Sequence, residues 1–141
     1  MLDIGRLVAF FESMTPASIE AIDKYYADDA CFKDPFNDVR GIGKIRRVYA
    51  HMFEQVAEPR FHVTERLVAD NGAFLTWDFT FRFRPGGAIE TVHGSSHLRF
   101  DAHEKIVYHC DYWDAAGELY AKVPVLGALM RLARRRLSAG V

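Results

Sequence analysis

The feature that most restricts the fold of this chain is a series of four strand-like segments in its second half. Each segment has the composition and the alternation of side chains that are typical of a β-strand with one buried face. Turn signals rich in glycine and aspartate or asparagine separate them, so neighbouring strands are expected to pair antiparallel. The predicted strands are residues 60–69, 73–84, 88–100 and 105–113, with turns at residues 71–72, 85–87 and 101–104.

Three helical segments precede these strands. Apolar residues recur at helical spacing in each, and Thr15 followed by Pro16 is a typical helix start. Helices first and strands later indicate an α+β fold, and 141 residues, half of them hydrophobic, suffice for one core. The predicted helices span residues 2–13, run from Pro16 to about Ala27, and run from Gly43 to the residue before Pro59.

A short motif lies between the second and third helices. Residues 25–36 have the sequence Tyr-Tyr-Ala-Asp-Asp-Ala-Cys-Phe-Lys-Asp-Pro-Phe. The alternation places Phe32 and Asp34 on one strand face, and Pro35 ends the strand because it cannot donate to a ladder.

This motif resembles the helix-to-strand signature of the nuclear transport factor 2-like superfamily, which includes ketosteroid isomerases, SnoaL-like polyketide cyclases and limonene epoxide hydrolases. The resemblance implies a cone-shaped α+β barrel, also called cystatin-like, in which a strongly bent antiparallel sheet wraps around three N-terminal helices. We expect residues 1–116 to form this domain and residues 117–141 to add a basic amphipathic helix to it.

The resemblance to ketosteroid isomerases implies a catalytic base. Their general base is the Asp of the Asp-Pro pair, which matches Asp34 here, although Asp34 could instead cap a turn at Pro35. Their two oxyanion donors are replaced, because Phe10 occupies the Tyr position and Ser96 the acid position. An enolate needs such donors, so we do not expect steroid isomerisation by the same set of residues.

The last strand gives a second comparison. Residues 105–114 resemble the ending of limonene epoxide hydrolases and SnoaL-like cyclases, and Asp111 matches a catalytic Asp. Alternation places His109, Asp111 and Trp113 on one face, which the resemblance implies is the cavity face. The epoxide hydrolase triad is incomplete, because Thr76 occupies its Arg position.

The resemblance also implies an orientation for residues 73–84. It points Phe74, Thr76, Asp78, Thr80 and Arg82 into the cavity. Five apolar side chains, Leu75, Trp77, Phe79, Phe81 and Phe83, would then lie on the convex face, where we expect a second subunit to cover them in a homodimer. If the register is off by one residue, these side chains line the pocket instead.

We therefore predict an acid/base site in an apolar cone. Desolvation raises the pKa of a carboxyl group in such a place, so that it can exchange a proton near neutrality, and a histidine can take the complementary part. The predicted catalytic residues are Asp34, His109 and Asp111, and the predicted substrate-binding residues are Tyr26, Phe32, Thr76, Asp78, Thr80, Ser96 and Trp113.

The expected ligand is a small hydrophobic molecule of polyketide, steroid or terpenoid size. Isomerase, cyclase or dehydratase chemistry without a cofactor or a metal would fit, because no metal-ligand spacing is present. The alternative is a non-catalytic module for binding or dimerisation. An epoxide hydrolase is the weaker alternative.

The net charge and the targeting signals restrict the partners and the cellular location that we expect. The net charge of −1 gives no general attraction to nucleic acid, and neither a signal peptide nor a membrane span is recognised, so we expect a cytoplasmic protein. Cys31 and Cys110 are expected to be reduced.

The C-terminal segment is basic. Five basic residues and one acidic residue lie from Glu118 onward. Residues 124–138 predict an amphipathic helix that could cover the cone mouth or lie on anionic lipid. We expect packing against its own domain or a partner subunit rather than against a membrane.

Overall fold

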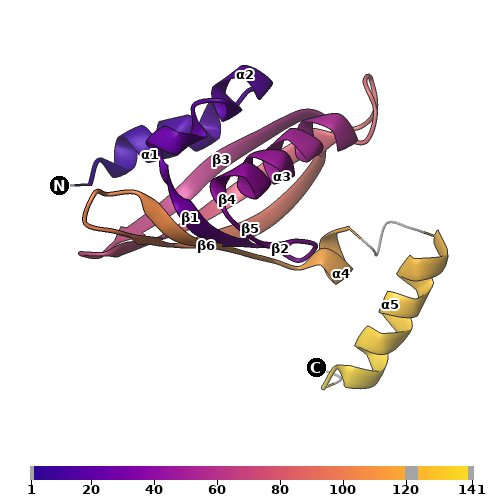
Figure 1. Cartoon of the computed structure of the whole chain (residues 1–141). Helices are drawn as coiled ribbons and strands as arrows, with labels where there is room; N and C mark the ends of the chain where they lie inside the picture. Colours follow the sequence, from indigo (N-terminus) through magenta and orange to yellow (C-terminus); the bar gives the residue numbers. More distant parts are fainter. Residues whose placement is uncertain (1, 120–123, 140–141) are drawn as a thin grey trace.

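The computed structural model describes residues 2–119 and 124–139. One sheet of six strands carries the three N-terminal helices on one face (Figure 1). The strands are β1 (Tyr26–Lys33), β2 (Asp38–Arg40), β3 (Ala57–Val68), β4 (Gly72–Arg82), β5 (Glu90–Phe100) and β6 (Ile106–Trp113). The helices are α1 (Ile4–Glu12), α2 (Pro16–Ile19), the 3₁₀ turn η1 (Ile22–Lys24), α3 (Ile42–Gln55), α4 (Ala115–Glu118) and α5 (Pro124–Leu137).

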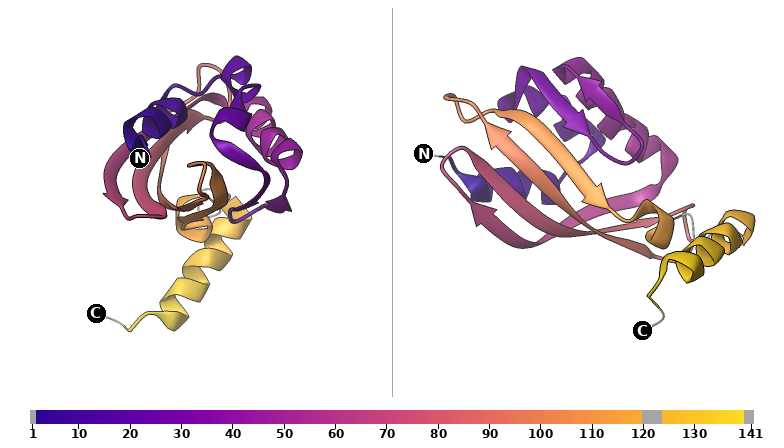
Figure 2. Two further views of the ribbon diagram at one scale, coloured as in Figure 1. Left: turned by 60° about the vertical axis from the view of Figure 1, so that its left-hand side comes forward. Right: turned by 90° about the horizontal axis from the view of Figure 1, so that it is seen from below.

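The sheet has the strand order β2-β1-β6-β5-β4-β3. Strands β3 to β6 form the predicted antiparallel meander, whereas β1 joins β6 in parallel, with Phe32 opposite His109. The sheet curves strongly without closing, and α1, α2 and α3 cover its concave side (Figure 2). The α+β fold is confirmed, with one parallel pair inside an otherwise antiparallel sheet.

The second helix starts as predicted but is much shorter. Thr15 accepts a hydrogen bond from the Ser18 amide, and Ser18 accepts one from the Thr15 amide, which forms a capping box. The helix ends at Ile19, so the prediction of a helix up to Ala27 is wrong. The 3₁₀ turn η1 follows, and β1 begins at Tyr26, where this residue pairs with Ile106 of β6.

The orientation predicted for β4 is also wrong, and the alternative register is correct. The side chains of Leu75, Trp77 and Phe81 are buried in the core. The core is therefore rich in aromatic rings, as burial of large apolar surfaces favours. Phe61 of β3 stacks on Phe79 with 4.6 Å between ring centroids and lies edge-on to Trp77 at 5.3 Å.

Because these side chains are buried, they cannot form the convex patch from which the homodimer was expected. The convex face carries the opposite set of β4 residues. Asp78 there pairs with His93, with 2.5 Å between Oδ1 and Nδ1, and the Thr76 hydroxyl bonds that of Thr64 at 2.7 Å. Thr80 lies in the same set, so none of these three predicted substrate-binding residues faces the core.

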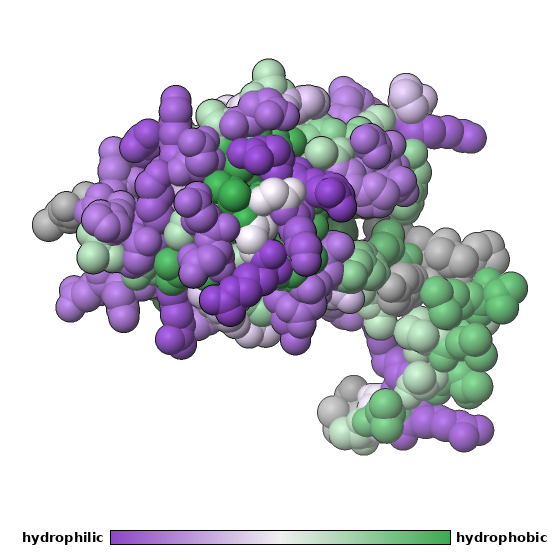
Figure 3. Space-filling view, viewed as in Figure 1, coloured by the Kyte–Doolittle hydropathy of each residue, from purple (hydrophilic) through white to green (hydrophobic). Residues whose placement is uncertain are grey.

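The C-terminal helix α5 projects from the body of the molecule (Figures 1 and 3). Four of its apolar side chains are exposed, so the expected packing against its own domain does not cover them: Val125, Leu129, Leu132 and Leu137. None of the helices within residues 2–119 and 124–139 combines the length and the hydropathy needed to cross a membrane.

Candidate functional site

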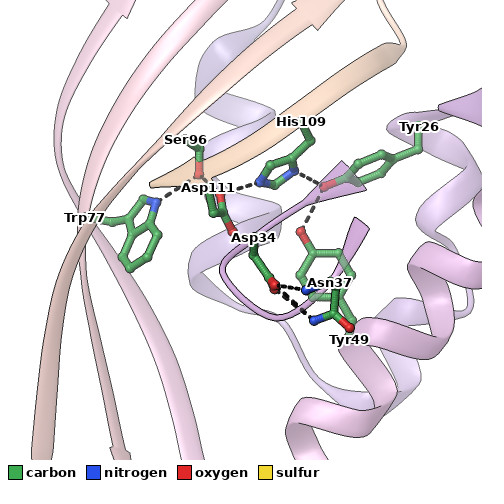
Figure 4. Close-up of polar contacts among 8 residues, drawn as sticks. All are labelled: Tyr26, Asp34, Asn37, Tyr49, Trp77, Ser96, His109 and Asp111. Carbon is green, nitrogen blue, oxygen red and sulfur yellow. Dashed lines mark hydrogen bonds and ion pairs between the residues drawn. The ribbon is translucent and has the colours of Figure 1, made fainter. Parts of the chain in front are cut away.

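A chain of hydrogen bonds crosses the core from helix α3 to strand β4 (Figure 4). The Tyr49 and Tyr26 hydroxyls lie 2.9 Å apart, and Tyr26 lies 2.7 Å from His109 Nδ1. On the other side of the ring, His109 Nε2 lies 2.6 Å from Asp111 Oδ1. The Ser96 hydroxyl donates to the same Asp111 oxygen at 2.5 Å and accepts from Trp77 Nε1 at 2.9 Å.

The sheet register brings these side chains together. Ser96 of β5 lies directly opposite Asp111 of β6, and His109 precedes Asp111 by two residues on the same face. The Trp77 ring lies against Gly94, since a Cβ atom there would come within 2.7 Å of Trp77 Cζ2. A glycine at this position therefore lets the indole lie close to the sheet, where its Nε1 reaches Ser96.

The network is deeply buried. His109 and Ser96 are the two buried polar residues among those the structure describes, with exposed fractions of 2% and 5%. The rings of Phe32 and Phe11 pack against His109, with centroid distances of 4.7 and 5.9 Å. Buried polar groups of this kind are costly unless they are paired, and here each finds a partner.

Burial also affects the two tyrosines. It raises the pKa of Tyr26 and the pKa of Tyr49 well above 10, and the nearby charge of Asp111 raises both pKa values further. Both side chains therefore remain neutral hydroxyls around neutral pH. They can pass on a hydrogen bond or a proton, but they do not act as phenolates.

The direction of the hydrogen bonds depends on the protons of His109. With one proton, on Nε2, His109 donates to Asp111 and accepts from Tyr26, which accepts from Tyr49. With two protons, Nδ1 donates to Tyr26, Tyr26 donates to Tyr49, and the Tyr49 hydroxyl must find another acceptor. A second proton on His109 thus frees the hydroxyl of Tyr49, beyond Tyr26 in the network, to donate a hydrogen bond.

Two hollows meet at Asp111. A small cavity of about 20 Å³, with room for about one water molecule, has a wall formed by Tyr49, Ser96, His109 and Asp111 together with apolar side chains. An open groove of about 570 Å³ is large enough for a small organic molecule. Its lining comprises Lys33, Asp34, Pro35, Tyr108, Cys110, Asp111, Tyr112, Trp113 and Asp114.

Asp111 is the member of the network that also lines the groove. Its side chain is 13% exposed. Both hydrogen bonds from Ser96 and His109 go to Oδ1, and within the described part of the chain no donor binds Oδ2. Oδ2 is free to accept a proton, while Oδ1 is held in place.

The amino-acid sequence itself has a recognisable family. A family model described as the SnoaL-like domain matches residues 7–109. The chain belongs to the SnoaL-like domain family. A search of curated proteins found no match.

Solved structures share the fold of this SnoaL-like domain. A protein with a ketosteroid isomerase-like fold from Catenulispora acidiphila, in complex with trimethylamine, superposes with a TM-score of 0.69 at 15% identity, over 84% of this chain and 92% of that one. A proposed SnoaL-like polyketide cyclase from Shewanella denitrificans gives 0.69 at 18%, over 87% and 98%. A proposed isomerase of the SnoaL-like family from Agrobacterium tumefaciens gives 0.65 at 13%, over 79% and 93%.

Asp34 of this SnoaL-like domain holds its own loop. Its Oδ1 accepts hydrogen bonds from the amides of Phe36 and Asn37 at 2.8 and 2.7 Å, and the Asn37 side chain contacts both carboxylate oxygens. This geometry agrees with the alternative that Asp34 caps a turn at Pro35. Asp34 still lines the groove, on the same wall as Asp111.

The other predicted residues divide into two groups. Tyr26, Phe32 and Ser96 belong to the network or pack against it, and Trp113 lines the groove, edge-on to Phe36 at 5.5 Å. Thr76, Asp78 and Thr80 lie on the convex face. No cluster of three or more metal-ligating side chains occurs among the described residues.

Tyr49 and Trp77 were not predicted as site residues. Tyr49 follows Ile45 by one helical turn on the buried face of α3. A buried tyrosine hydroxyl needs a partner, and that requirement was the available signal. Trp77 could be found only once the orientation of β4 was known.

Proposed function

We propose that this SnoaL-like domain binds a small hydrophobic molecule in the groove beside β6 and carries out acid/base chemistry on it without a cofactor. The isomerase, cyclase and dehydratase types fit. The observation that supports this proposal is the buried chain of hydrogen bonds that ends at Asp111, a residue that also lines the groove. The family and the isomerase and cyclase descriptions of its structural neighbours agree with it.

In the proposed reaction Asp111 is the base. Its Oδ2 takes a proton from a carbon next to a carbonyl group. The electron pair of that C–H bond forms a C=C bond, while the π pair of the C=O bond moves onto the oxygen. Ser96 and His109 hold the carboxylate by two hydrogen bonds to Oδ1. Return of the proton to a different carbon gives the isomer.

Tyr49 is the donor for the oxygen. The small cavity that Tyr49 and Asp111 both line has room for one water-sized group. A carbonyl oxygen there would accept from the Tyr49 hydroxyl when His109 carries two protons. Hydrogen bonds that strengthen as charge develops on an oxygen are a large term in such reactions. The proposal gives Asp34 the part of shaping the groove wall.

A second function, binding without catalysis, has its own support. The small cavity measures only about 20 Å³ and aromatic rings form much of its wall, and Asp34 is engaged by its own loop. The groove alone would then be the binding site. The epoxide hydrolase alternative has no such support, because Thr76 and Asp78 point away from the core.

A matched pair of variants tests the proposal. The wild type, Asp111→Asn and Asp34→Asn are incubated with cyclic enones, hydroxyketones and epoxides, binding is followed by thermal shift, and products are analysed. We expect Asp111→Asn to bind ligand but to convert it at least about 10²-fold more slowly. Asp34→Asn keeps the acceptor for the loop amides and should lose only a few-fold.

Two results would count against it. Loss of turnover in Asp34→Asn with full turnover in Asp111→Asn would make Asp34 the base. Binding by all three proteins with no conversion would favour the non-catalytic function.

A further inference from the structure

The helix α5 has a wide apolar arc, and its own domain leaves a large part of this arc uncovered. With 3.6 residues per turn, the apolar side chains form two adjacent stripes. The exposed fractions of Val125, Leu129 and Leu132, in the first stripe, are 76%, 56% and 43%, and that of Leu137 at the end is 87%. The second stripe comprises Leu126, Met130, Ala133 and Leu137.

The first stripe of the arc faces away from the rest of the molecule, whereas Leu126 and Met130 of the second stripe are half-buried. In Figure 3 the hydrophobic residues of α5 gather on the side turned outward. Of the arginines on the polar side, Arg134 lies near the body, since a Cβ atom on Gly117 would lie 2.9 Å from its Nη2, and Arg131 and Arg135 are exposed. A helix that served to close the core of its own domain would bury the first stripe.

The charge of this segment has one sign. No acidic residue follows Glu118, and α5 carries four arginines. Arg131, Arg134 and Arg135 lie on the side opposite the apolar arc, whereas Arg136 follows Leu132 by one turn within it. The chain before Glu118 has the opposite balance, with 18 acidic and 13 basic residues.

This combination favours an anionic apolar surface over a second copy of α5. Two copies of α5 packed together would bring eight arginines near each other, and Arg136 would be buried without an acidic partner from the facing helix. At a lipid surface the same arginine can extend its charged end to the phosphates while its carbon chain stays among the leucines.

We propose that α5 docks on the surface of an anionic lipid bilayer, with its apolar arc at the boundary of headgroups and acyl chains and its arginines among the phosphates. A basic amphipathic helix supplies the two contributions that such binding needs, buried apolar area and attraction to anionic lipid. The domain is then held at a membrane without crossing it.

The test is sedimentation of the full chain with vesicles of phosphatidylcholine alone and of phosphatidylcholine mixed with phosphatidylglycerol. The variants are Leu129→Glu on the arc and, as a matched control, Leu67→Glu, since Leu67 is another exposed leucine, at 70%, on β3. Both changes replace the same residue type and alter the charge equally. Circular dichroism and thermal unfolding should show both variants folded.

We expect the wild type and Leu67→Glu to sediment with the anionic vesicles and hardly with the neutral ones. Leu129→Glu should bind at least about tenfold more weakly, because a buried leucine is replaced by a charge. Replacing Arg131 and Arg135 by Gln should weaken binding about fivefold for each arginine removed. High salt should also weaken binding, because it screens the attraction between the arginines and the anionic lipid.

Several results would overturn the proposal. These are no sedimentation of the wild type, equal sedimentation with both kinds of vesicle, or equal binding by Leu129→Glu and Leu67→Glu. Self-association of the wild type that is lost in Leu129→Glu, without binding to vesicles, would show that a second copy covers the arc.

Discussion

At the scale of single residues, His109 controls the site because both of its ring nitrogens are engaged. Its Nδ1 is hydrogen-bonded to Tyr26 and its Nε2 to Asp111. A change in the protonation of His109 therefore alters the hydrogen bonds at both ends of the network. Alternation along the last strand was enough to predict that His109 and Asp111 share a face. The sequence could not show Tyr26 as the third member, because that contact depends on a parallel pairing of distant strands.

Tyr26→Phe should destabilise the fold. The change removes one hydroxyl and leaves His109 Nδ1 and the Tyr49 hydroxyl without their partner in a buried place, which costs about 1–3 kcal/mol of unfolding free energy. Tyr25→Phe is the control, because Tyr25 stacks on Phe10 at 4.2 Å through its ring, and phenylalanine keeps that contact. Urea unfolding measures both, and equal losses would contradict the role of the Tyr26 hydroxyl.

The same tyrosines predict a loss of stability at alkaline pH. Burial raises the pKa of Tyr26 and Tyr49 above the value of 10.0 that applies to the unfolded chain. Above pH 10 the unfolded state therefore loses protons that the folded state keeps, and the free energy of unfolding falls as pH rises. The stabilisation is complete below this pH.

Urea unfolding at a series of alkaline pH values measures this effect. The slope should be smaller in Tyr26→Phe, which has one such group fewer. An identical slope in the variant and the wild type would show that the Tyr26 hydroxyl ionises equally in both states.

At the scale of elements, strand β4 shows where sequence reasoning fails. Its two-residue period identifies two sets of side chains, but not which set is buried. The family resemblance pointed Thr76 and Asp78 inward, whereas the transfer free energy of large rings favours Trp77 and Phe81 inside. The structure agrees with the transfer free energy, because Trp77 and Phe81 are buried. The alternation itself was predicted correctly, so a single choice of face decided three of the predicted site residues.

The packing of β4 on β5 makes Gly94 sensitive to substitution. In Gly94→Ala the new methyl group meets the Trp77 ring, which has to move away from Ser96. Overpacking of this kind costs about 1–3 kcal/mol. Thermal unfolding measures the loss of stability, and tryptophan fluorescence measures the movement of the Trp77 ring.

Gly43→Ala is the control, because a Cβ atom at Gly43 meets nothing within 4 Å. It lies inside α3, where alanine is the better helix former, so it should be neutral or slightly stabilising. Unchanged stability and fluorescence in Gly94→Ala would mean that the indole does not lie on this glycine.

At the scale of the whole molecule, the order of helices and strands was sufficient to predict the fold class. The homodimer remains a prediction. The argument that led to it no longer applies, because the β4 rings are buried in the core. The basic helix was predicted in its bounds and its two faces. Its position was not, because an amphipathic pattern shows that an apolar face exists without showing what covers it.

Removal of residues 120–141 should leave the domain intact. The exposed apolar side chains of α5 contribute little to the core, so the free energy of unfolding should change by less than about 1 kcal/mol, which corresponds to roughly 4 °C or less in Tm. Calorimetry of the full and shortened chains measures this. A much larger drop would show that α5 packs on its own domain in solution.

The parallel contact between β1 and β6 has a consequence for the order in which the chain can fold. Tyr26 and His109 are 83 positions apart, and β1 has no partner but the short β2 until the last strand is present. Contacts that close such long loops form late and slow folding. During synthesis, the N-terminal part must therefore wait for nearly the whole domain to leave the ribosome. The candidate site is assembled in the last step of folding, so a chain that stops short of β6 has neither the network nor the groove.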